Sequence, residues 1–141
     1  MNKLILVFLV VLLNAQTLFC AEIQIYKPNS SLIANHGHVE VFTITTVGEL
    51  TRYYLESNNI PHIAGEHGVN SIYNTPVGLE TYEIISDYHM KVYGWCFAVD
   101  GLLGSTLMSQ AIFDPQKNET ISWYYGYAEY FKGEWIGYCL Y

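Results

Sequence analysis

Aromatic side chains are concentrated at the C-terminal end of the sequence, where nine of the last 19 residues are Trp, Tyr or Phe. A Tyr or Trp ring combines a flat apolar face with a polar group. Exposed rings of this kind can therefore stack on sugars, tetrapyrrole-like rings or a protein partner. The alternative is that all of the rings are packed within a sheet. The sequence thus contains a candidate binding surface. The exposure of each ring to solvent decides between a binding surface and packing within the sheet.

Successive residues of a strand point to opposite faces of its sheet, so the tail aromatics fall into two sets. We expect the set with the larger apolar area to be buried, because Trp and Phe gain most from leaving water. This set comprises Trp123, Tyr125, Tyr127 and Phe131. The opposite set then supplies the candidate ligand-binding residues, which are Tyr124, Tyr130 and Tyr138.

Histidine and carboxylate residues give little support for metal binding or catalysis. An extended segment would place His36 and His38 on one side, and a single loop holds His62 and His67. A transition-metal site needs three or four converging ligands, and nothing in the sequence fixes a third, so we predict no metal site. The sequence contains no nucleophile elbow and no HExxH motif. We therefore predict a protein that is not an enzyme.

A hydrolase remains the enzymatic alternative, and it would depend on Ser86, Asp87 and His89. These three residue types can form a catalytic triad. A triad is defined by geometry, however, and closeness in sequence does not supply that geometry. The sequence alone therefore assigns no catalytic residue.

The N-terminus has the pattern of a secretion signal, with Lys3 followed by an apolar run over residues 4–13. Ten apolar residues suit a signal and are far fewer than the ~20 that a membrane-spanning helix needs. We predict a signal over residues 1–20, cleavage after Cys20 or Ala21, and no transmembrane span in the mature chain. Lipidation of Cys20 is disfavoured by the bulky Phe19 before it. The predicted location is periplasmic or extracellular.

Removal of the signal leaves two cysteines, Cys96 and Cys139. An even number of cysteines in an exported chain predicts a disulfide between them. The alternative is a pair of buried free thiols.

Length and charge limit the remaining possibilities. The chain has 141 residues, so about 121 follow the signal, which is enough for one domain. Its net charge is −7, and loss of Lys3 leaves −8 with five Lys or Arg. Such a chain lacks the basic surface that nucleic-acid binding requires, so we exclude a nucleic-acid partner. We predict an irregular lead-in over residues 21–37 and a single domain over residues 38–141.

Local patterns predict the elements of this domain. Alternation over residues 38–45 indicates a strand, and Thr46 with Glu49 forms a capping box for a helix that ends before Asn58. Thr75-Pro76 predicts the start of a second helix that reaches residue 85. The remaining predictions are a central strand over 92–99, an Asp100-Gly101 turn with Gly101 at positive φ, a strand within 107–113, and a hairpin over 120–131 and 134–141. This order predicts an α+β fold, with one sheet and helices on one side.

Three runs of the sequence, residues 74–80, 93–101 and 121–128, carry a resemblance to a known family. They are NTPVGLE, YGWCFAVDG and ISWYYGYA. In this order they resemble a bacterial domain family of unknown function that is related to the C-terminal domain of transcobalamin and intrinsic factor. The resemblance implies a β-grasp-like mixed sheet packed on one main helix. It also makes cobalamin a candidate ligand. The chain lacks the large helical domain that completes the cobalamin clamp, so we assign no cofactor.

These observations favour a small exported, non-enzymatic binding module that presents an aromatic surface to a ligand. The ligand would be corrinoid-like or a glycan. The first alternative is a protein–protein interaction domain of the cell envelope without a small-molecule ligand. The second is the uncharacterised hydrolase. The identity of the small molecule or protein partner is not specified by the sequence.

Overall fold

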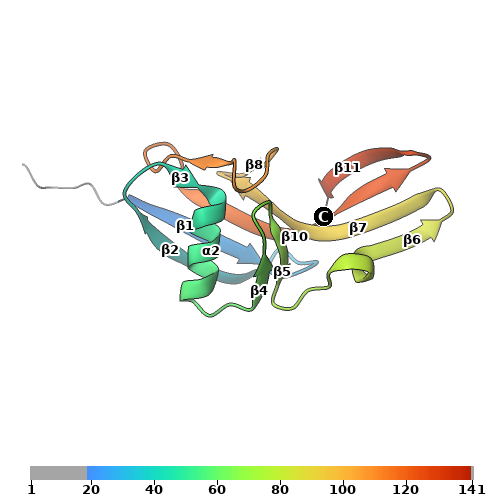
Figure 1. Ribbon diagram of the computed structural model, residues 1–141, viewed down its shortest axis with the longest axis horizontal. Helices are drawn as coiled ribbons and strands as arrows, with labels where there is room; N and C mark the ends of the chain where they lie inside the picture. Colours follow the sequence, from blue (N-terminus) through green and yellow to red (C-terminus); the bar gives the residue numbers. More distant parts are fainter. Residues whose placement is uncertain (1–18, 141) are drawn as a thin grey trace, which may run out of the picture.

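The computed structural model describes residues 19–140 and has an α+β fold, as predicted. A seven-stranded mixed sheet has one face covered by helix α2 (Figure 1). The main path of the sheet is β2-β1-β10-β7-β6, with β11 beside β10 and β8 beside β7. The elements are β1 Phe19–Tyr26, β2 Ile33–Val41, β3 Thr45–Thr46, α2 Val47–Ser57, β4 His62–Ala64, β5 Val69–Ile72, the 3-10 helix η1 Gly78–Thr81, β6 Tyr82–Ser86, β7 His89–Val99, β8 Leu102–Leu103, β9 Ile112–Phe113, β10 Thr120–Phe131 and β11 Glu134–Leu140.

Helix α2 begins and ends where the sequence predicts. Thr46 is its N-cap, and the reciprocal capping box with Glu49 is present. The helix ends at the C-cap Asn58. Its buried face includes Thr51 and Leu55, and the Thr51 hydroxyl accepts a hydrogen bond of 3.0 Å from the Trp123 indole. This contact joins the helix to the centre of the sheet.

The predicted irregular lead-in over residues 21–37 is wrong, because most of this segment lies in two antiparallel strands, β1 and β2. Ala21, Ile23 and Ile25 alternate with polar residues and are fully buried against the helix side of the sheet. Strand β1 also pairs in parallel with β10, with Ile23 opposite Ile121. A turn near residues 27–31 connects the two strands. The predicted signal lies outside the described residues, except for the start of β1.

The predicted second helix, from Thr75 to residue 85, is also wrong. A 3-10 helix covers Gly78–Thr81 only, and residues 82–86 form strand β6. Gly78 has a φ of +62°, which interrupts a right-handed helix. The Thr75 hydroxyl accepts a hydrogen bond of 2.8 Å from the Trp95 indole. The Thr75 side chain, which was expected to cap a helix, is therefore hydrogen-bonded to Trp95 of strand β7.

The predicted central strand is β7, which pairs with β10 on one edge and β6 on the other. It ends at Asp100 and Gly101, whose φ values are +50° and +79°. Two successive positive φ values define the Asp-Gly hairpin turn that leads into β8, so the prediction for Gly101 is confirmed. The strand predicted within residues 107–113 is confined to β9.

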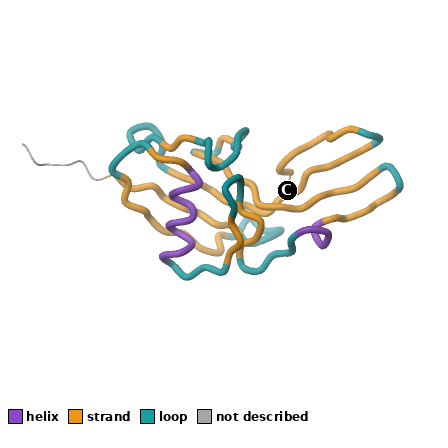
Figure 2. The backbone as a smooth tube through the Cα atoms, in the orientation of Figure 1, coloured by secondary structure: helices purple, strands orange, loops and turns teal. Residues whose placement is uncertain are grey.

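The hairpins β6–β7 and β10–β11 extend beyond the part of the sheet that α2 covers (Figure 1, Figure 2). Their strands remain paired with one another, since β7 and β10 are in register from Val99 opposite Ile121 to His89 opposite Phe131. The molecule therefore has a helix-covered part and a protruding part with two uncovered faces.

Candidate functional site

Burial along β10 follows the predicted alternation only where the helix covers the sheet. Trp123 is 1% exposed and Tyr125 is 8% exposed, whereas Tyr124 on the opposite face is half-buried. Phe131 belongs to the set predicted to be buried, yet it is 37% exposed. Its position at the tip of the protruding hairpin explains the difference, because no helix packs there. Tyr127 is half-buried between these two regions.

A cleft of about 880 Å³ lies beside β10, within the ~300–1,000 Å³ of most small-molecule sites. Strand β1 pairs with β10 as far as Trp123, and β11 pairs with it from Tyr127 onwards. Between these positions, no strand of residues 19–140 is paired with this edge of β10. The turn that follows β1 and the end of β11 border the opening. The lining contains six tyrosines, which are Tyr26, Tyr93, Tyr124, Tyr125, Tyr127 and Tyr138.

Two of the three predicted ligand-binding residues, Tyr124 and Tyr138, line this cleft. Tyr138 is 63% exposed and its ring stacks with Trp135, with centroids 6.2 Å apart. Tyr130 is not among the lining residues. Its ring instead packs edge-on against Trp135, with centroids 5.4 Å apart. The structure therefore brings two of the three candidates to one cavity and leaves the third outside it.

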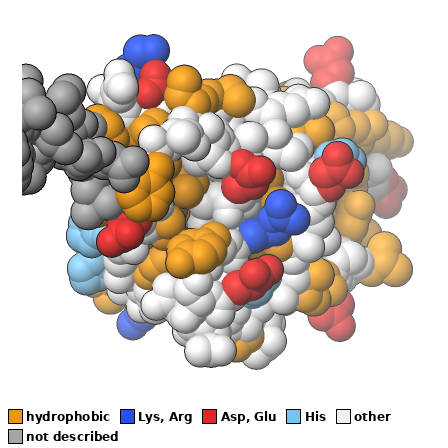
Figure 3. Space-filling view, turned by 60° about the vertical axis from the view of Figure 1, so that its left-hand side comes forward, with side chains coloured by type: hydrophobic (Ala, Val, Ile, Leu, Met, Phe, Trp, Pro, Cys, Tyr) orange, Lys and Arg blue, Asp and Glu red, His pale blue; other side chains and the backbone are white. Residues whose placement is uncertain are grey.

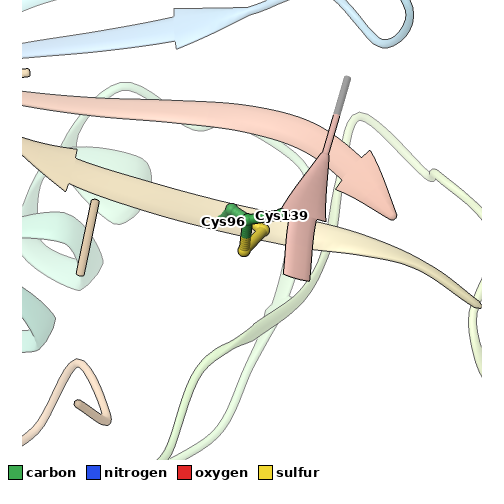
Figure 4. The surroundings of a disulfide bond; sticks show 2 residues. All are labelled: Cys96 and Cys139. Atoms are coloured by element: carbon green, nitrogen blue, oxygen red, sulfur yellow. A yellow bond between two sulfur atoms is a disulfide. The ribbon is translucent and has the colours of Figure 1, made fainter. Parts of the chain in front are cut away.

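The wall formed by β11 is held by a disulfide. Cys96 of β7 and Cys139 of β11 are bonded, with Cα atoms 5.9 Å apart, so the predicted bridge is present (Figure 4). The bridge draws the end of β11 onto β10 at Gly126. A Cβ atom at Gly126 would lie 2.6 Å from the Leu140 carbonyl oxygen. Any residue other than glycine would therefore require a shift of β11. Gly126 and the disulfide together fix the position of Leu140 in the cleft.

The opposite wall is polar. Its turn is closed by hydrogen bonds from Lys27 N–H to the Leu32 carbonyl (2.9 Å) and from Ser30 N–H to the Lys27 carbonyl (3.2 Å). Gln24 of β1 accepts hydrogen bonds from the Tyr26 and Ser122 hydroxyls, at 3.1 and 3.3 Å. The polar lining therefore consists of Lys27, Asn29, Ser30, Ser31 and Ser122.

Tyr93 connects the cleft to the uncovered inner face of the protruding part. Its ring lies 6.1 Å from Tyr125 and 5.6 Å from Tyr127, between ring centroids. Its hydroxyl donates a 2.6 Å hydrogen bond to the Glu83 carboxylate, which is the main cause that raises the pKa of Tyr93 to about 12. The phenol therefore stays neutral at physiological pH. This arrangement suits stacking and hydrogen bonding of a ligand without proton transfer.

The residues considered for catalysis and metal binding have other hydrogen-bond partners or are exposed. The His89 Nε2 lies 2.6 Å from the Glu129 carboxylate, and the Ser86 hydroxyl accepts from the Tyr88 N–H at 3.4 Å, so neither hydrogen bond joins members of the supposed triad. His36 and His38 do lie on one side of β2, both exposed. Within residues 19–140, no group of three or more His, Cys, Asp or Glu could hold a metal ion.

Tyr26 and Lys27 are lining residues that sequence reasoning missed. Strand periodicity over residues 19–26 was the signal that could have placed Tyr26 at the end of a strand. Nothing local could have placed that strand beside β10, because 98 positions separate Ile23 from its partner Ile121 in β10.

No family model, curated protein or solved structure matches the chain. In the described part of the chain, no helix has the length and apolar character needed to cross a membrane.

Proposed function

We propose that this chain is a small exported, non-enzymatic module that binds a ligand in the cleft beside β10. The observation that carries the proposal is the cavity of about 880 Å³ with six tyrosines in its lining. Aromatic faces bind flat apolar surfaces, such as a sugar face or a corrinoid-like ring, while tyrosine hydroxyls and nearby polar side chains hydrogen-bond to the ligand's edge. The disulfide supports export, because such bonds persist in oxidising compartments.

For the fold, we propose a β-grasp-like relationship to the family that contains the C-terminal domain of transcobalamin. A mixed sheet with β1 parallel to β10 and one covering helix supports this assignment. In that family a second, helical domain completes the cobalamin clamp. The cleft of this chain combines tyrosine rings with small polar side chains, which suits a sugar, and we rank a glycan ahead of cobalamin.

The proposal predicts that replacing both Tyr124 and Tyr138 by Ala abolishes ligand binding. Each ring supplies stacking area to the cleft, and loss of a central aromatic contact weakens binding by about 2 kcal/mol or more. The measurement is a thermal-shift screen of the oxidised protein against neutral oligosaccharides, acidic oligosaccharides and corrinoids. A ligand that binds only the native state must raise the melting temperature.

The matched control is Tyr53→Ala. Tyr53 is 61% exposed on helix α2 and does not line the cleft, so this variant should bind as the wild type does. Both variants should fold with a free energy of unfolding within ~1 kcal/mol of wild type. Equal melting-temperature shifts for the double variant and the wild type would contradict the proposal.

A second candidate function, protein–protein interaction, is favoured by the segment from η1 to the β6–β7 turn. Leu79 is 87% exposed and Ile84 is 77% exposed, and Ile85 and Tyr88 are exposed as well. Strand β6 is the end of the main sheet path, so its outer edge is open. An apolar strand with a free edge is suited to pairing with another strand. A second copy of this chain offers the same edge, and it is the partner considered for this candidate.

This candidate predicts concentration-dependent self-association that Ile84→Lys abolishes, because a charge at the edge blocks strand pairing. Sedimentation velocity measures the effect. The control is Ile112→Lys, since Ile112 is 60% exposed on β9, which pairs with β3 and not with β6. Wild-type protein that sediments as a monomer at every concentration would rule out pairing between copies.

A further inference from the structure

The charge of the cleft is opposite to the charge of the chain. The chain has 13 Asp and Glu residues against six Lys and Arg. Among residues 19–140, the cleft lining nevertheless contains one charged side chain, Lys27, and no Asp or Glu. On the face shown in Figure 3, acidic side chains are spread over the surface and basic ones are sparse. A cation in the cleft is therefore a specific feature of this site.

The carboxylates near the lining are occupied by donors of the protein itself. The Asp100 oxygens accept hydrogen bonds from the Asn118 amide and from the Glu119 and Thr120 N–H groups, at 2.8 to 3.0 Å. The Glu22 carboxylate accepts a hydrogen bond of 3.0 Å from the Gln24 amide, and the Glu83 carboxylate accepts one of 2.6 Å from the Tyr93 hydroxyl. None of these three carboxylates forms an ion pair with Lys27.

The backbone of Lys27 is held in place while its side chain is exposed. Its N–H and its carbonyl both take part in the turn that follows β1, and the Ser30 hydroxyl accepts the Leu32 N–H at 3.0 Å. That hydroxyl keeps its own proton for donation. Lys27, with its charged side chain, and Ser30, with its hydroxyl, are thus both lining residues of the cleft, as are Tyr138 and Leu140 of β11. This combination of donors fits an anionic oxygen.

We propose that the ligand of the cleft is an acidic carbohydrate, whose carboxylate binds the Lys27 ammonium while its sugar faces stack on the tyrosines. The inference rests on the proposed function and specifies the class of ligand. A neutral sugar would gain the stacking contacts but not the charged contact. Binding is non-covalent, and no bond is made or broken.

The experiment compares a galacturonate tetrasaccharide with its fully methyl-esterified form, in which each carboxylate charge is replaced by a neutral methyl ester. Isothermal titration calorimetry on the oxidised protein at low ionic strength should show about fivefold tighter binding of the acid form, as expected for one exposed ion pair. Lys27→Gln should lower the affinity for the acid form to that for the ester and so remove this preference. Salt should weaken binding of the acid form only. Lys132→Gln, a change at a lysine outside the cleft lining, should retain the preference.

The outcomes separate this inference from the function on which it rests. Equal affinities for acid and ester would overturn the role of Lys27 and leave a stacking cleft in place. Binding of a corrinoid but of neither tetrasaccharide would overturn the carbohydrate class alone. Absence of any melting-temperature shift across the whole panel would overturn the proposed function itself.

Discussion

Replacement of Cys96 and Cys139 together by Ser should lower the free energy of unfolding by about 4 kcal/mol. The two residues are 43 positions apart, and a bridge that closes a loop of this length removes a corresponding amount of entropy from the unfolded chain. The loss is a large part of the 5–15 kcal/mol that typically stabilises a domain. Urea unfolding of the oxidised protein, followed by circular dichroism, measures it.

The same replacement should also weaken ligand binding under conditions in which the variant is folded. The bridge holds Cys139 and Leu140 in the cleft wall, and the end of β11 has few other regular contacts, since its pairing with β10 is interrupted by register shifts. Ser105→Ala is the control, because Ser105 is exposed and does not line the cleft. It should change neither property. A reductant should lower the stability of the wild type to that of the double variant, and a loss below ~1 kcal/mol would contradict the expectation.

Sequence reasoning predicted those elements whose signals are local. The capping box at Thr46 and Glu49 involves side chains three residues apart, and the Asp100-Gly101 turn needs two adjacent residues that tolerate positive φ. The run over residues 92–99 is apolar on both faces, which is typical of an interior strand. In each case the residues that determine the structure are neighbours in the sequence.

The errors arose where a local signal had two readings. Thr75-Pro76 resembles a helix start, but the Thr75 hydroxyl is used by the Trp95 indole, 20 residues away. Residues 19–26 alternate as a strand does, but the turn residues near Pro28 suggested irregular structure. Only pairing with β10, about 98 residues later, gives β1 its place in the sheet. Such long-range partners are invisible to periodicity.

The candidate site was predictable in part for the same reason. Tyr124 and Tyr138 come from the aromatic tail itself, and an even cysteine count was sufficient to predict the bridge. Tyr26 and Lys27 enter the cleft only because β1 ends beside β10. Alternation along the strand predicted that Tyr130 would join Tyr124 at the binding surface, but Tyr130 lies outside the cleft. A register shift between Glu129 and Tyr130 changes how the rings of the hairpin are arranged.

Trp123→Ala should lower the free energy of unfolding by about 3–5 kcal/mol, the usual cost of truncating a large buried aromatic side chain. Trp123 is almost fully buried between the sheet and α2, and its ring lies 5.4 Å from Phe97, between centroids. The matched control is Trp135→Ala. Trp135 is 43% exposed in β11, so its loss should cost about 1 kcal/mol or less. Urea unfolding of both variants measures the difference, and equal losses would show that α2 is not packed on Trp123.

The indole hydrogen bond of Trp123 can be separated from its packing. Trp123→Phe keeps a ring but removes the donor to the fully buried Thr51 hydroxyl, so part of its destabilisation, about 1–2 kcal/mol, should come from leaving that hydroxyl without its partner. Thr51→Val removes the hydroxyl and retains the shape of the side chain. The double variant should therefore be more stable than the sum of the two single losses implies. Strict additivity in urea unfolding would mean that the indole and the hydroxyl are not coupled, and that the helix is held to the sheet by apolar packing alone.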